Sequence, residues 1–176
     1  KIHYPVTLKA NSSSIQHKTE LGVVRLDIRN EKELKKAYKD ISNNLRKRLN
    51  KEGFILEKYL PGTEIFIGGI KHKTFGSLIS VGSGGILVEL TSDIQTRLAP
   101  IAYNQSMDMI RELKGKQLLE GYRTNQKTNI HSLAKIISQI SKIIHRYNDK
   151  IEEIEINPLI FSKGSWWVAD CLIKLV

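Results

Sequence analysis

Three oxygen-bearing side chains near the end of the sequence have a spacing that is typical of a divalent-metal site. Glu155 and Asn157 are two residues apart, so in a strand their side chains point to the same face. A turn at Lys163-Gly164 between two strands would bring Asp170 beside Asn157. Carboxylate and amide oxygens suit Mg²⁺ that also contacts nucleotide phosphates. The spacing is equally compatible with a strand that simply ends at Asn157 and Pro158.

A glycine-rich segment, Val81-Gly82-Ser83-Gly84-Gly85, joins two expected strands. Glycines allow backbone N–H groups to approach phosphate oxygens closely, and a run of such groups can bind an anion. The segment lacks the Gly-Lys-Ser/Thr of a P-loop, and it leads into a strand instead of the helix of a dinucleotide-binding fingerprint. Taken alone, the segment slightly favours a plain hairpin turn over a phosphate site.

Two further side chains could take part in phosphoryl chemistry. His17 lies in a polar loop, where a neutral imidazole could act as nucleophile or general base, although a lone loop histidine is more often a surface residue. Lys9 lies within an apolar strand, where an unpaired ammonium is costly, so it needs a carboxylate partner or a bound phosphate. We expect no zinc site, because the remaining histidines lack ligand-like spacing: His3, His72, His131 and His145.

Hydrophobic periodicity predicts the elements that would position these residues, beginning with a first group of three strands and one helix. Strands are expected at residues 5–10, 23–28 and 54–59. A basic amphipathic helix lies between the second and third strands and ends at Gly53. Asn30 and Glu33 have the spacing of a capping box, so they mark its beginning.

A second group of elements follows the hinge signal Leu60-Pro61-Gly62. Helices are expected from Asn104, as the capping residue, to Leu113, and over residues 130–147. Strands are expected at residues 64–70, 78–81, 86–90, 154–157 and 166–170. This order predicts an α+β fold of two lobes, residues 1–60 and 61–176, of which the second carries the metal-binding strands.

The composition narrows the class of protein. The 28 Lys and Arg residues outnumber the 18 Asp and Glu residues, which gives a net charge of +10 and suggests an anionic partner. Aromatic residues make up 7% and do not interleave with the basic helix, so specific nucleic-acid binding is poorly supported. The longest apolar run, Trp166-Trp167-Val168-Ala169, excludes a membrane-spanning helix. A single cysteine, Cys171, fits a reducing cytoplasm.

In their order along the chain, these motifs resemble the ATP-grasp domain of nucleoside-diphosphate-forming acyl-CoA synthetases, in particular the beta part of ADP-forming acetyl-CoA synthetase. The resemblance is more distant to the beta chain of succinyl-CoA synthetase. The N-terminal helical stretch usual in the family is absent, so we expect the first lobe to be incomplete. The matching segments cover almost the whole chain: residues 4–9, 15–22, 75–76, 82–89, 93, 97–100, 118–123, 155–159 and 168–170.

The resemblance implies a role for each candidate residue in a nucleotide cleft between two α+β lobes. Asn157 and Asp170 would bind Mg²⁺, His17 would relay a phosphoryl group, and Glu155 would steady the phosphohistidine. Lys9 would bind a phosphate of the nucleotide, and Glu64 would face the ribose. The adenine would contact the backbone of Glu57, Lys58 and Tyr59. The phosphates would lie near Gly82, Gly84 and Gly85.

The resemblance also implies an activity, the interconversion of acyl-CoA, ADP and phosphate with acid, CoA and ATP. The expected cofactor is Mg²⁺, with ATP or ADP as substrate, and the expected partner is a CoA-binding domain or alpha subunit. No specific nucleic acid and no membrane are expected as partners. An alternative is a binding or regulatory domain of a fused protein acetyltransferase, or an inactive relative. It is suggested by Gly22-Val23 where the family has Gly-Gly, and by His72-Lys73 where it has Asp-Pro.

Overall fold

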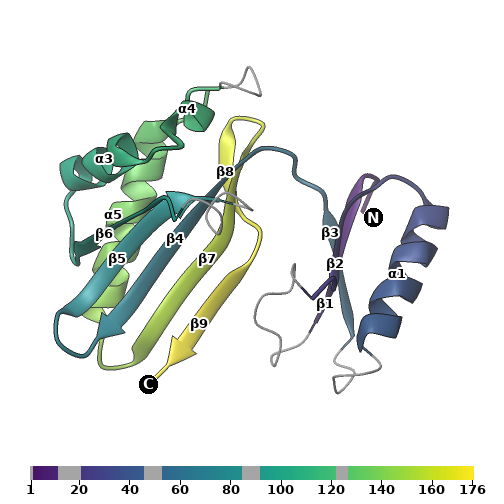
Figure 1. Cartoon of the computed structure of the whole chain (residues 1–176), viewed down its shortest axis with the longest axis horizontal. Helices are drawn as coiled ribbons and strands as arrows, with labels where there is room; N and C mark the ends of the chain where they lie inside the picture. Colours follow the sequence, from purple (N-terminus) through teal and green to yellow (C-terminus); the bar gives the residue numbers. More distant parts are fainter. Residues whose placement is uncertain (1, 12–20, 46–52, 85–91, 122–126) are drawn as a thin grey trace. The chain divides into compact units, whose positions relative to one another are not determined.

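The structure is a computed structural model that describes residues 2–11, 21–45, 53–84, 92–121 and 127–176 (Figure 1). Residue contacts divide the chain into two compact units, unit 1 from Lys1 to Leu60 and unit 2 from Pro61 to Val176. Each unit has its own sheet and its own hydrophobic core. No helix in the described ranges is long and apolar enough to cross a membrane.

Unit 1 is a three-stranded antiparallel sheet with the helix α1 (Glu31–Leu45) packed on one face (Figure 1). The strand order is β2-β1-β3, with β1 at Val6–Ala10, β2 at Val24–Ile28 and β3 at Phe54–Lys58. Alternate residues of β1 face the helix, because side chains alternate along a strand. The core of unit 1 consists of Val6, Leu8, Ala10, Val23, Ile28, Ala37 and Ile41.

The beginning of α1 is fixed by the cap that the sequence predicts. Asn30 Oδ1 accepts a hydrogen bond from the Glu33 amide at 3.0 Å, and the Glu33 carboxylate accepts from the Arg29 amide at 2.8 Å. These contacts satisfy amide groups that have no partner within the helix. The predicted capping box is thus confirmed, with its return bond one residue earlier than usual. The rest of the predicted helix, residues 46–52, lies outside the described residues.

Unit 2 is built on an antiparallel sheet with the strand order β6-β5-β4-β7-β8. Its long strand β7 (Ile151–Ser162) pairs with β8 (Ser165–Val168) along its second half and with β9 (Cys171–Leu175) along its first half. The other strands are β4 (Thr63–His72), β5 (Gly76–Ser83) and β6 (Ile94–Leu98).

Helices α3 (Tyr103–Glu112) and α5 (Ile130–Arg146) cover one face of this sheet, and the short α4 (Lys116–Leu119) follows α3 (Figure 1). Gly69 allows α5 to approach, since a Cβ there would lie 3.2 Å from Cβ of Ile144. The buried core between helices and sheet consists mainly of Ile65, Ile67, Ile79, Val81, Met109, Leu133, Ile137 and Ile156.

Unit 2 differs from the sequence predictions at several elements, among them the short helix α4, which was not predicted. Strand β6 was not predicted, and the strand predicted at residues 86–90 lies outside the described residues. Asn104 is not a cap, because α3 begins at Tyr103 and the Gln105 side chain accepts from the Ala102 amide at 2.9 Å. The strand predicted at residues 166–170 corresponds to β8, which ends at Val168, and the following strand β9 (Cys171–Leu175) was not predicted. The break between β8 and β9 lies opposite Pro158, which has no N–H to continue the ladder.

Candidate functional site

The candidate metal ligands of unit 2 lie where β7 passes from one partner strand to the next. The Asn157 amide donates to the Asp170 carbonyl at 3.2 Å, and the Ala169 amide donates to the Pro158 carbonyl at 3.0 Å. Asn157 and Asp170 are therefore neighbours across the ladder, as their spacing predicted. Glu155 joins them, because its Oε1 accepts from Asn157 Nδ2 at 3.2 Å.

The donor atoms of this cluster suit a hard cation. With its nitrogen held by Glu155, the Asn157 side chain presents its amide oxygen as the atom that can bind a metal. Asp170 is half-buried, and one of its carboxylate oxygens accepts from the Cys171 amide at 3.0 Å. Among the described residues, no group of three His, Cys, Asp or Glu side chains could hold a metal by itself. A metal here would thus depend on the Asn157 amide oxygen and on ligands beyond the acidic side chains of the described residues, such as the phosphates of a nucleotide that binds with Mg²⁺.

The described glycines of the 81–85 segment do not form a nest of free amides. Gly82 belongs to β5, the Ser83 amide donates to the Asp93 carbonyl at 3.2 Å, and the Gly84 amide donates to the Glu64 carbonyl at 2.9 Å. Gly84 instead provides close packing, since a Cβ there would lie 2.4 Å from the carbonyl carbon of Glu64. Gly85 lies outside the described residues.

Glu64 lies on β4 beside Gly84, and its side chain is half-buried. Burial raises the pKa of its carboxyl group, because desolvation disfavours the charged form. A carboxyl group kept in such surroundings is more typical of a binding site than of a surface.

Lys9 of unit 1 has the carboxylate partner that its apolar strand requires. Its Nζ lies 2.7 Å from Glu57 Oε2, and the two residues are diagonal neighbours across β1 and β3, since Lys9 pairs with Ile55 and Glu57 with Thr7. Lys9 is 9% exposed, whereas the Glu57 side chain is 40% exposed. Glu57 therefore balances the Lys9 charge within unit 1, and the pair has no net charge.

The backbone groups of the predicted adenine-binding residues do not all face the same way. The Tyr59 amide donates to the Pro5 carbonyl at 3.1 Å, and Glu57 pairs directly with Thr7. Because amide directions alternate along a strand, the N–H and C=O of Lys58 point away from β1, toward the outer edge of β3. Of these three residues, Lys58 is therefore the one whose backbone can meet a ligand at this edge.

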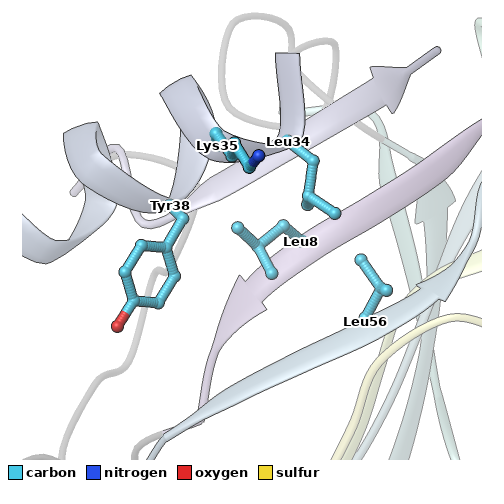
Figure 2. Close-up of a pocket in the computed structure, with 5 residues that line it drawn as sticks. All are labelled: Leu8, Leu34, Lys35, Tyr38 and Leu56. Carbon is cyan, nitrogen blue, oxygen red and sulfur yellow. The ribbon is translucent and has the colours of Figure 1, made fainter. Parts of the chain in front are cut away.

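An apolar depression of about 280 Å³ lies on the other face of the same sheet (Figure 2). Leu8 and Leu56 line it from β1 and β3, and Leu34, Lys35 and Tyr38 line it from α1. Leu8 and Lys9 are consecutive in a strand, so the depression and the Lys9 ammonium lie on opposite faces. This depression is therefore not part of the charged site.

Sequence reasoning assigned no role to one buried charged residue, Asp93, whose carboxylate accepts from the Lys114 and Gly115 amides. Its partners include backbone groups more than twenty residues away, so no side-chain spacing could reveal it. His17, the predicted phosphoryl carrier, lies outside the described residues.

Comparison with known proteins places the chain in a family. A family model described as an ATP-grasp domain matches residues 1–175. The beta subunit of acetate–CoA ligase (ADP-forming) I from Pyrococcus furiosus is 36% identical over 179 residues, which cover 99% of this chain and 77% of that subunit. The 4-hydroxybutyrate–CoA ligase (ADP-forming) of Nitrosopumilus maritimus is 35% identical, and the match covers 93% of this chain but 24% of that enzyme.

Solved structures agree with the sequence relatives. The dinucleotide-forming acetyl-CoA synthetase 1 of Ca. Korarchaeum cryptofilum, in complex with coenzyme A and Ca-AMPCP, superposes with a TM-score of 0.87 at 32% identity, over 99% of this chain and 78% of that one. A second structure of that enzyme has Mg-AMPPCP and a phosphohistidine segment that points towards the nucleotide-binding site; its TM-score is 0.76 at 31% identity, with the same shares of the two chains covered.

The chain belongs to the ATP-grasp family, with the α+β fold that the sequence predicted. Its relatives are ADP-forming acid–CoA ligases or beta subunits of them, as the resemblance implied.

Proposed function

We propose that this chain is the nucleotide-binding part of an ADP-forming acid–CoA ligase, which interconverts acyl-CoA, ADP and phosphate with acid, CoA and ATP. The observation that carries the proposal is the contact between Asn157 and Asp170 at the middle of β7, in a chain of this family. The relatives favour this function over that of a regulatory domain in a fused acetyltransferase.

Asn157 and Asp170 would hold Mg²⁺ through an amide oxygen and a carboxylate. The ion would neutralise charge on the phosphate oxygens of a bound nucleotide. Glu155 orients the Asn157 amide through Oε1, which leaves its second oxygen for a histidine N–H. That arrangement supports the predicted role of Glu155 beside a phosphohistidine.

Unit 1 would contribute to the binding of the nucleotide in two ways. The Lys9 ammonium would attract a phosphate, and Glu57 balances its charge when no phosphate is bound. The outward-facing backbone N–H and C=O of Lys58 would recognise the edge of the adenine. Glu64 of unit 2 would accept from a ribose hydroxyl, and Gly82, Gly84 and Gly85 would lie near the phosphates.

His17 would carry the phosphoryl group between the CoA-binding partner and ADP. A neutral imidazole nitrogen attacks the phosphorus of the donor, so a P–N bond forms and the bond to the donor oxygen breaks. In the second step a β-phosphate oxygen of ADP attacks, a P–O bond forms, and the P–N bond breaks to give ATP and neutral histidine. The donor and CoA sites would belong to a partner subunit or domain.

Titration of the assembled enzyme with ADP, with Mg²⁺ or with a chelator, tests the nucleotide and metal assignments. Asp170→Ala removes a charged ligand and should weaken Mg-ADP binding at least tenfold, about 1.4 kcal/mol. Asn157→Ala removes a neutral ligand and should have a smaller effect. Asp149→Ala, at an exposed aspartate in the turn before β7, is the control and should bind as the wild type does. Unchanged affinity in the Asp170/Asn157 double variant would refute the metal site.

A second experiment tests the role of His17 separately from binding. Labelled phosphate followed through the assembled enzyme should give acid-labile, base-stable label on this chain, and none on the His17→Ala variant. Mg-ADP affinity should stay within about threefold, roughly 0.65 kcal/mol, because the imidazole is not a nucleotide ligand. His145→Ala, at an exposed histidine of α5, should retain the label. Normal turnover by His17→Ala would exclude His17 from the mechanism.

A further inference from the structure

Asp93 is 3% exposed and lies just before β6, where its carboxylate joins three separate segments of unit 2. Oδ1 accepts from the Lys114 amide at 2.8 Å. Oδ2 accepts from the Gly115 amide at 2.8 Å and from Ser83 Oγ at 2.6 Å. The carboxylate therefore connects the end of β5 with the turn between α3 and α4.

The packing around this carboxylate leaves no room for a side chain at position 115. A Cβ on Gly115 would lie 2.3 Å from Ser83 Oγ and 3.1 Å from Asp93 Oδ2. Ser83 is itself only 4% exposed. The end of β5 and the turn between α3 and α4 are therefore held close to Asp93, by the Ser83 hydroxyl and by the Lys114 and Gly115 amides.

The negative charge of the buried Asp93 carboxylate is stabilised by its hydrogen-bond donors. Burial alone would raise the pKa of this carboxyl group, but the hydrogen bonds from Ser83, Gly115 and Lys114, with the positive charge of Lys114, lower the pKa below its usual range. The carboxylate is thus ionised at neutral pH and remains an acceptor for all three donors.

The connection continues from Ser83 into the candidate site. The Ser83 amide donates to the Asp93 carbonyl, so Asp93 holds this residue by both its backbone and its side chain. The next amide, that of Gly84, donates to the Glu64 carbonyl at 2.9 Å, and Gly84 packs against the Glu64 backbone. A shift of Ser83 would therefore displace Gly84 relative to Glu64.

We propose that Asp93 is a positioning residue for the nucleotide, which acts through Ser83 to fix Gly84 against Glu64. Asp93 is buried and need not touch the substrate. This inference rests on the proposed function, because Gly84 and Glu64 matter for binding only if the nucleotide lies beside them. It adds Asp93, Ser83 and Gly115 to the residues on which nucleotide affinity depends.

Two serines of β5 provide a matched test. Ser83→Ala removes the hydroxyl that Asp93 binds, and Ser77→Ala removes a hydroxyl that donates to the Ile144 carbonyl at 3.3 Å. Both serines are 4% exposed, and both side chains face the helices, but Ser77 lies at the opposite end of the strand. Each variant loses one buried hydrogen bond, and the bond to the Asp93 carboxylate is the stronger because it is charge-assisted. A purely structural role therefore predicts a lower melting temperature for Ser83→Ala but the same Mg-ADP affinity for both.

The measurements are the melting temperature, the dissociation constant of Mg-ADP, and the KM for ADP in the assembled enzyme. We expect both variants to melt slightly lower than the wild type. Ser83→Ala should raise the dissociation constant and KM about fivefold, and Ser77→Ala should leave both within about 1.5-fold. Asp93→Asn keeps the shape but loses the charge, and should raise both at least as much as Ser83→Ala does.

Each outcome distinguishes the inference from the proposed function. Equal Mg-ADP affinity in Ser83→Ala and Ser77→Ala would overturn the positioning role and leave the proposed function intact. A wild-type enzyme that does not bind Mg-ADP would instead refute the proposed function. If Asp93→Asn fails to fold, the two serine variants still test the positioning role, because each removes only a single hydrogen bond.

Discussion

Glu64 provides a test of whether a site residue reduces the stability of the fold. Its folded-state pKa is raised by burial, so the native state holds this proton more tightly than the unfolded chain does. Ionisation then favours unfolding, and stability falls as pH rises from the unfolded pKa, about 4.3, through the raised folded value. The ionised form of Glu64 therefore reduces the stability of the fold, so stability alone does not explain a glutamate at this position.

The expected result is that Glu64→Gln is more stable than the wild type at pH 7, by less than about 1 kcal/mol. The difference should vanish at about pH 3, more than one unit below the unfolded pKa, where the wild-type carboxyl is protonated in both states. Urea unfolding at several pH values measures it, with Glu120→Gln, at an exposed position, as the control. A Glu64→Gln variant that is less stable than the wild type at pH 7 would show that the carboxylate stabilises the fold.

The sequence predicted some site residues and missed others for a physical reason. Asn157 and Asp170 could be paired because a turn at Lys163-Gly164 fixes which residues lie opposite each other. Asp93 could not be recognised, since two of its three donors are backbone amides, which every residue except proline carries. The sequence also did not show that the Ser83 and Gly84 amides donate to the carbonyls of Asp93 and Glu64, because these pairings depend on how the strands are aligned.

Among the elements, α1 has a cap whose contribution can be measured. Asn30→Ala removes the acceptor for the Glu33 amide and should destabilise unit 1 by about 1 kcal/mol. Asn43→Ala, at an exposed position inside the same helix, should be neutral or slightly stabilising because alanine favours helices. Urea unfolding followed by circular dichroism compares them. Equal effects at Asn30 and Asn43 would contradict the role of the cap.

Long periodic elements were predicted better than short ones. α5 was expected because its apolar residues recur on one face over 17 residues. Its first turn is capped by Asn129, whose side chain accepts from the Ser132 amide. β6 was missed because its two apolar residues, Ile94 and Leu98, are exposed and its other residues are polar. Alternation of buried and exposed side chains is too weak there to indicate a strand.

For the whole molecule, the net charge of +10 leads to a prediction about selectivity. A phosphate-binding protein of this charge should also attract DNA weakly, with an affinity that falls steeply as salt rises. We expect duplex binding at low ionic strength that is lost at about 150 mM salt, and Mg-ADP binding that persists there. Titrations of both ligands across a salt series measure this. Tight DNA binding at 150 mM would favour a nucleic-acid partner instead.

The family could be predicted from the order of the motifs, because each short motif is weak but their sequence along almost the whole chain is specific. The unit boundary after Leu60 falls at a Pro-Gly pair between β3 and β4, where neither a helix nor a central strand can continue. Which residues converge within each unit depends on tertiary packing, so it required the structure.

The long strand β7 has a consequence for how the proposed metal ligands respond to thermal motion. Residues 153–156 and 159–161 of this strand have β4 on one side and β8 or β9 on the other, and Asn157 lies between these two stretches. Amides in such a strand exchange with deuterated solvent only when much of the sheet opens, whereas outer strands exchange through local fraying. The Asn157 amide should therefore be among the slowest to exchange. Its backbone would then be in place before a cation arrives, and Glu155 already accepts from its side-chain Nδ2, so little ordering would remain to oppose binding.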